Sequence, residues 1–117
     1  MEYSLDVKNA RLEVTRDLLD GGSLEILSDT GMRIVSMQLD DVSGVVRFGS
    51  LIFNGFPKFA MAENKGHAAI AQLKCKAGEV KARALTVGAS NADIVMGNVD
   101  IDTANVVKIE RAEIKHA

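Results

Sequence analysis

Apolar and polar residues alternate along the last part of the chain, residues 67–117, and turn-forming residues separate the alternating runs. In the first run, Ala69, Ala71, Leu73 and Cys75 fall on one side of an extended chain, and Lys74 falls on the other. Successive side chains of a strand point to opposite faces, so this pattern predicts a strand with one buried face.

Two further runs in this part of the chain have the same period. After a turn at Ala77 and Gly78, the side chains of residues 80–86 divide between the two faces of an extended chain. One face has Val80, Ala82, Ala84 and Thr86, and the other has Lys81, Arg83 and Leu85. Over residues 106–115, Val107 and Ile109 stand opposite Lys108 and Glu110. Runs joined by short turns predict an antiparallel sheet with one solvated face.

The front of the chain has the period of a helix instead. Four apolar residues at spacings of three and four form a stripe, which Leu12 and Leu19 widen; they are Val7, Ala10, Val14 and Leu18. Ser4 or Asp6 can cap the start, and the φ > 0 conformations that Gly21 and Gly22 adopt readily can end the helix. The sequence leaves open whether this helix packs on the sheet of its own subunit or reaches a neighbouring subunit as an arm.

Short strands and turns are expected in the middle of the chain. Apolar runs at residues 24–27, 32–39, 45–48 and 51–53 are separated by turn-forming residues, among them Asn54 and Gly55. Pro57 suits an edge or a connection better than a central strand. The whole pattern predicts an all-β fold, an antiparallel β-sandwich or jelly roll of about eight strands with one N-terminal α-helix. We expect a single domain, with residues 1–22 as helix or arm and residues 23–117 as the sandwich.

Composition narrows the function without naming it. The chain has 117 residues, 47% of them hydrophobic and 26% charged, with a formal net charge of −2. A mildly acidic protein with scattered lysines and arginines gives no electrostatic reason to expect nucleic acid as a partner. No run reaches the roughly 18 apolar residues of a membrane span, and the first residues do not resemble a secretory signal. The one cysteine, Cys75, is expected in the core beside Leu73.

Candidate catalytic and metal-binding residues are few. His67 follows a polar loop and His116 is next to last, so both are expected at the surface, and no histidine–cysteine pair has zinc spacing. Asp93, Asp100 and Asp102 are the best candidates for a calcium site, although acidic residues in turns usually bond their own backbone. We therefore predict no catalytic residue, no cofactor and no metal, and hence a protein that is not an enzyme.

Aromatic residues bear on carbohydrate binding, which a β-sandwich could provide. The chain has no tryptophan, one tyrosine and four phenylalanines. Phe48, Phe53, Phe56 and Phe59 are close enough in sequence to form one core cluster, which is the interpretation we favour. A carbohydrate-binding module remains as an alternative.

Two segments resemble a family of small structural proteins of tailed-phage and prophage virions. One is NARLEVTRDLLDGGSLEIL at residues 9–27, where a short helix ending in glycine precedes a strand. The other is the hairpin LKCKAGEVKARALTVG followed by ADIVMGNVDIDTANVVKIERAEIKHA at residues 92–117. Residues 45–54 lie where the family has a similar strand. The chain departs from the family in a short loop at residues 29–31 and in Asn105, where a glycine is usual.

This resemblance implies a virion protein with a β-sandwich or jelly-roll fold. The role it implies is that of a capsid decoration or cement protein, made in the cytoplasm of the host bacterium, which binds the outer surface of the assembled capsid. Its partner would be the major capsid protein of the same phage, and the protein would form a homo-oligomer, a dimer or a trimer. A minor tail protein is the alternative within the family.

Contacts with partners are expected from residues 1–12 and 56–65, because termini and irregular connections reach neighbours more readily than a paired sheet does. The predicted partner-binding residues are Met1, Glu2, Tyr3, Ser4, Leu5, Phe56, Pro57, Lys58 and Phe59.

Overall fold

The computed structural model describes residues 1–103 and 105–116 of the protein. One helix precedes a series of short strands. In chain order, the elements of the described residues are α1 (Leu5–Leu19), β1 (Ser23–Ser28), β2 (Arg33–Gln38), β3 (Gly44–Arg47), β4 (Ser50–Phe53), β5 (Lys58–Met61), β6 (Gly66–Lys74), β7 (Val80–Gly88), β8 (Ile94–Met96), β9 (Asp100–Ile101) and β10 (Val106–Lys115). The predicted all-β fold with one N-terminal helix is confirmed.

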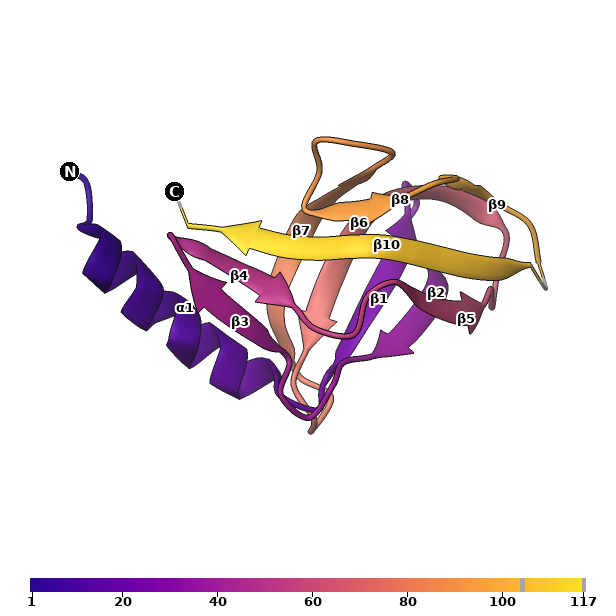
Figure 1. The fold of residues 1–117 in the computed structure, drawn as a ribbon. Helices are drawn as coiled ribbons and strands as arrows, with labels where there is room; N and C mark the ends of the chain where they lie inside the picture. Colours follow the sequence, from indigo (N-terminus) through magenta and orange to yellow (C-terminus); the bar gives the residue numbers. More distant parts are fainter. Residues whose placement is uncertain (104, 117) are drawn as a thin grey trace.

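The strands form one sheet that curls until its two halves face each other (Figure 1). The order along the sheet is β2-β1-β6-β7-β8-β10-β4-β3, while β5 pairs with β10 and β9 with β6. Neighbours run antiparallel except β7 and β8, which are parallel. The expectation of a purely antiparallel sheet is therefore wrong at this pair, because residues 89–93 fold back and set β8 beside the end of β7 in the same direction.

One hydrophobic core lies between the two halves of the sheet. Leu24 and Leu73 come from one half and Leu51 from the other, and all three are completely buried. The strand predicted over residues 106–115 is confirmed as β10, in which Val107 and Ile109 face the core.

Helix α1 begins and ends close to the predicted positions. The side chain of Ser4 accepts a hydrogen bond from the backbone N–H of Val7 at 3.4 Å, so Ser4 is the N-cap. Gly21 has a φ of +69°, as predicted for the residue that ends the helix. Gly22 has a different role, because a Cβ there would come within 2.0 Å of the backbone oxygen of Lys74.

Only the two leucines that were expected to widen the predicted stripe pack on the protein, and the four residues at its centre do not. The helix lies against β3 and β4, and its buried side chains are Leu12 and Leu19, which join the core. The helix therefore packs on its own subunit, but the stripe of Val7, Ala10, Val14 and Leu18 faces solvent. Because the front of the chain has apolar residues on two faces of one helix, its period alone could not show which face is buried.

Two β-bulges change the predicted alternation in β6 and β7. The pairing of β1 with β6 shifts register beside Ser28, so that Ala68 is buried with Ala71 and Leu73 while Ala69 is only partly buried. In β7, Ala84 adopts a φ of +61° and becomes exposed, and Leu85 turns inward in its place. A strict period of two does not allow for the extra residue of a bulge.

The expected cluster of four core phenylalanines is also wrong. Phe53 is buried and Phe56 packs against the core, but Phe48 and Phe59 are 82% and 61% exposed. Phe48 and Gly49 form the two-residue turn between β3 and β4, and both have positive φ, which is the geometry of a type I′ hairpin. The turn directs Phe48 away from the core.

Cys75 lies outside the core as well. β6 ends at Lys74, and Cys75 opens the turn to β7, where its N–H donates to the backbone oxygen of Glu79 at 2.9 Å. The thiol is partly exposed. Hydrogen bonds from the backbone at Glu79 and Ala77 lower the pKa of the Cys75 thiol.

Candidate contact surfaces

The N-terminal segment predicted to bind partners is exposed. Met1, Glu2, Tyr3, Ser4 and Leu5 all lie at the surface. Their exposure makes them available for contacts.

Contacts with other parts of the chain hold this end in place. The ring of Tyr3 meets the ring of His116 edge to face at 5.9 Å, and the guanidinium of Arg11 lies 4.5 Å from the Tyr3 ring centroid. The backbone N–H of His116 donates to the backbone oxygen of Gly49 in the β3–β4 turn. The two ends of the chain and this turn therefore form one corner of the molecule.

The second predicted segment is only partly available to a partner. Phe56 packs against the core, and Lys58 donates to a carboxylate oxygen of Asp40 at 2.6 Å while lying 5.5 Å from the Phe56 ring centroid. Pro57 and Phe59 are exposed. Two of the four predicted residues thus support the local structure, and two face outward.

The structure places these two segments far apart. α1 and the chain ends lie at one end of the molecule, and β5 lies at the other (Figure 1). The molecule extends 43 × 27 × 23 Å along its principal axes. The nine predicted residues therefore belong to two separate surfaces and do not form one site.

Three exposed apolar side chains lie together on β5 and β10, and the sequence did not predict this group. Phe59 stands opposite Lys108 and Met61 stands opposite Val106 in the antiparallel pair. Phe59, Met61 and Val106 are 61%, 56% and 62% exposed, and the Lys108 ammonium lies 6.0 Å from the Phe59 ring centroid. We call these four residues the β5–β10 patch. The sequence predicted Phe59 as a contact residue, and the period of two in residues 58–61 is a signal for Met61 on the same side, but nothing in the sequence places Val106 beside them.

A second exposed apolar group is the stripe of Val7, Ala10, Val14 and Leu18 on α1, which we call the outer stripe. Val7, Val14 and Leu18 are 41%, 61% and 51% exposed. Large exposed apolar side chains that gather in one place mark surfaces for contact with other molecules more often than isolated ones do.

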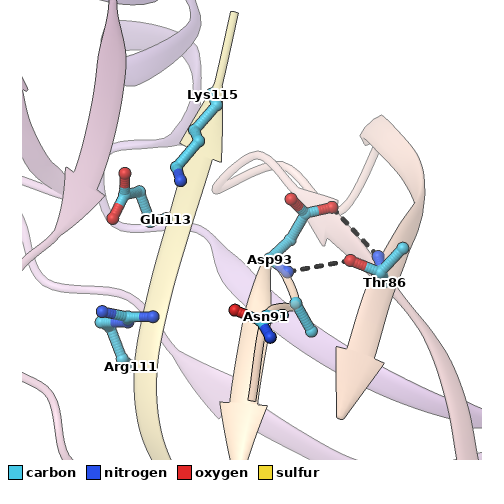
Figure 2. Close-up of a pocket in the computed structure, with 7 residues that line it drawn as sticks. Thr86, Asn91, Asp93, Arg111, Glu113 and Lys115 are labelled. Carbon is cyan, nitrogen blue, oxygen red and sulfur yellow. Dashed lines mark hydrogen bonds between the residues drawn. The ribbon is translucent and has the colours of Figure 1, made fainter. Parts of the chain in front are cut away.

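A shallow cavity of about 260 Å³ lies between the outer face of β10 and the loop at residues 89–93 (Figure 2). Asp93 and Thr86 close the loop, because the N–H of each donates to the side chain of the other at 2.9 and 3.0 Å. Arg111, Glu113 and Lys115 alternate along the strand beside it. Two cations and two carboxylates in its lining favour no ligand of a single charge.

The candidate chemical residues do not converge. His67 and Asp100 form a pair at 2.8 Å that ties the start of β6 to β9, and both are largely exposed. Asp93 bonds Thr86 instead of lying with Asp100 and Asp102. Across residues 1–103 and 105–116 there is no group of three or more histidine, cysteine, aspartate or glutamate side chains that could hold a metal ion.

Glu25 in β1 is a buried carboxylate, although it points away from the core residues Leu24 and Ile26. Its carboxylate accepts hydrogen bonds from Gln72 at 2.7 Å and from Arg33 at 3.0 Å, and Lys74 forms an ion pair with it at 3.1 Å. Burial alone raises the pKa of this carboxyl, but the three partners outweigh burial and hold the pKa below 4.5. The network joins β1, β2 and β6 and stabilises the sheet.

Comparison of the chain with models of protein families, with curated proteins and with solved structures finds no match. Among the residues that the structure describes, no helix has both the length and the apolar character needed to cross a membrane.

Proposed function

We propose that this protein is a non-enzymatic structural component of a phage virion, a capsid decoration or cement protein that binds the outer surface of the assembled capsid. The resemblance of residues 9–27 and 92–117 to small phage virion proteins supports this role. The structural observation that carries the proposal is the exposure of Phe59, Met61 and Val106 on one outward face. Aromatic and methionine side chains are enriched in protein interfaces.

A cement protein acts by mass action. It binds the assembled lattice and not the dissociated subunits, so each bound copy stabilises the assembled state. Individual contacts can be weak, because repetition over many equivalent sites adds their effects. The major capsid protein of the same phage is the proposed partner, and the capsid surface is the proposed location.

The shape of the molecule suits this role. The N-terminal corner and the β5–β10 patch lie at opposite ends of a molecule 43 Å long. A protein with contact surfaces at both ends can hold two neighbouring subunits together. We assign the contacts to Met1, Tyr3 and Leu5 at one end, and to Pro57 and the β5–β10 patch at the other.

The exposed phenylalanines favour one alternative, a sugar-binding module. Sugars stack on exposed aromatic faces, and Phe48 and Phe59 are both accessible. A minor tail protein is the alternative within the virion. Binding of the purified protein to bare capsids, to purified tails and to a glycan array separates the three functions.

The decisive experiment is co-sedimentation of the protein with capsids assembled from the major capsid protein of the same genome. We expect saturable binding, and we expect the variant Phe59→Ser, Met61→Ser to lose most of it. The matched control is Ile70→Ser, which removes an apolar side chain, 40% exposed, from β6, outside both assigned contact surfaces. Absence of binding by the unchanged protein would overturn the proposal, and equal loss in the control would overturn the assignment to the patch.

A further inference from the structure

We propose that the outer stripe of α1 binds a second copy of the same protein, with the two helices parallel about a two-fold axis. This inference goes beyond the proposed function and stands on the helix alone, whatever partner the β5–β10 patch binds. The stripe consists of Val7, Ala10, Val14 and Leu18, as defined above.

The outer stripe is not needed for the fold of its own subunit. Leu12 and Leu19 are 3% and 0% exposed and attach the helix to the core, whereas Val14 and Leu18 are 61% and 51% exposed. An exposed face of a surface helix normally carries polar residues, and apolar residues there indicate an unfilled contact. The helix thus has two apolar faces and one of them is occupied.

The geometry of the helix leaves room for a second copy. Each residue advances the side-chain direction by about 100°, so the outer stripe points almost opposite to Leu12 and Leu19. A helix docked on the stripe therefore places the sheet of the second copy on the far side, away from β3 and β4. Fifteen residues give a contact about 22 Å long.

The charges beside the outer stripe favour a second copy of the protein as the partner and favour a parallel direction for its helix. Asp6, Glu13 and Asp17 flank one edge of the stripe, and Arg11 and Lys8 lie beyond the other. In a parallel two-fold pair, the acidic edge of each helix meets the basic edge of its partner. In an antiparallel two-fold pair, acidic meets acidic and basic meets basic. The surface is therefore complementary to itself in the parallel arrangement.

Over residues 7–14 the residue types agree with this arrangement, and Asp17, at the next position of the repeat, is paired with Arg16 of its own helix at 3.1 Å. Val7 and Val14 are seven residues apart, the length of one coiled-coil repeat. Ala10 lies three residues after Val7 and four before Val14, which is the second contact position of that repeat. β-branched residues at such repeated positions favour parallel two-stranded pairing. Ala10 is small and permits a close approach of the two backbones.

The contact is small, so the pair is expected to be weak. Two short helices bury less than the roughly 1,200 Å² of the smallest stable interfaces. Free protein is therefore expected to be mainly monomeric at low concentration and to dimerise as concentration rises. A disulfide placed in the stripe can trap the pair.

The test is oxidative cross-linking of Val7→Cys in a Cys75→Ser background. A parallel pair sets the two introduced thiols side by side, so a covalent dimer is expected to form at least tenfold faster than with Val45→Cys. Val45 is the matched control, since it is also a valine that is 41% exposed but lies in β3. Adding Val14→Glu to Val7→Cys is expected to abolish the cross-link without lowering the melting temperature.

Two results would overturn the proposal. In an antiparallel pair, position 7 of one helix faces position 18 of its partner, and the two copies of position 7 are about 16 Å apart. Rapid cross-linking of a mixture of Val7→Cys and Leu18→Cys, with none in Val7→Cys alone, would establish that direction instead. Cross-linking no faster than in the Val45→Cys control at high protein concentration would exclude the second copy as occupant. Neither readout involves capsids, so failure here is distinct from failure of the decoration role.

Discussion

The two faces of helix α1 are alike in sequence and opposite in structure. Leu12 and Leu19 are buried in the core, while Leu18, the residue next to Leu19, is half exposed on the outer stripe. Apolar character did not decide which face was buried. The position of β3 and β4 did, because the hairpin offers the helix one surface to cover. One face therefore contributes to folding, and the other is free to contribute to association.

The largest expected effect comes from the inner face. Leu19→Ala removes a completely buried side chain where α1 joins the core and leaves a cavity. We expect a loss of about 2–5 kcal/mol in the free energy of unfolding. Urea denaturation followed by circular dichroism measures it. A loss below about 0.5 kcal/mol, within the range of ordinary surface substitutions, would show that the helix is not part of the cooperative unit.

A smaller effect is expected at Glu25, which shows that a residue pointing away from the core can still be buried. Glu25→Ala leaves Arg33 and Lys74 without their shared carboxylate, and both cations keep some access to water. We expect a loss of about 1–3 kcal/mol in the free energy of unfolding, measured in the same urea series. Glu25→Gln is the matched variant that keeps the shape of the side chain.

Glu25 also makes the stability of the folded protein depend on pH. Since the pKa of Glu25 is lower in the folded protein than its usual 4.5, its stabilisation is complete above that value and is lost as pH falls through the lowered pKa. Stability curves in the acid range are expected to be less steep for Glu25→Gln than for the unchanged protein. Curves of equal slope would contradict this role of the carboxylate.

The N-cap tests how far α1 depends on its own sequence. Ser4→Ala removes the acceptor of the Val7 N–H at an exposed helix end. We expect a loss of about 0.5–1 kcal/mol, at the lower end of the effects of N-cap replacement. Thermal unfolding measures it, and Ser4→Asp is expected to restore stability because aspartate is also a good cap. A Ser4→Asp variant no more stable than Ser4→Ala would contradict a capping role.

The smallest effect on folding is expected on the outer stripe. Leu18→Ala shortens a side chain that is already half exposed, so the free energy of unfolding is expected to change by less than about 0.5 kcal/mol. The comparison with Leu19→Ala in the same urea series is direct, since the two leucines are adjacent. Equal losses in both variants would show that the outer stripe also supports the fold.

The sequence predicted correctly those strands in which buried and exposed residues alternate with a regular period. The start of β10 is the best example, because Val107 and Ile109 alternate with charged residues before the register shift that follows Ile109. The prediction was wrong where the backbone departs from regular geometry. Ala84 at φ +61° reverses the alternation of β7, and Phe48 at φ +51° turns a phenylalanine outward. Neither conformation has a residue-specific signal, since alanine and phenylalanine rarely adopt positive φ.

The contact surfaces were harder to predict than the fold. Exposure of residues near the N-terminus could be expected from their position at the chain end. The β5–β10 patch could not, because Met61 and Val106 are far apart in sequence and meet only through strand pairing. Phe56 and Lys58 appeared available in the sequence, and the tertiary contacts with the core and with Asp40 occupy them.

The most direct test of the proposed role is the thermal stability of capsid shells with and without the protein. Shells assembled from the major capsid protein of the same phage would be heated with a saturating excess of this protein, and their dissociation would be followed by light scattering. A cement protein binds only the assembled state, so we expect the dissociation temperature to rise with protein concentration and then to level off. Shells that dissociate at the same temperature at every concentration would contradict the role.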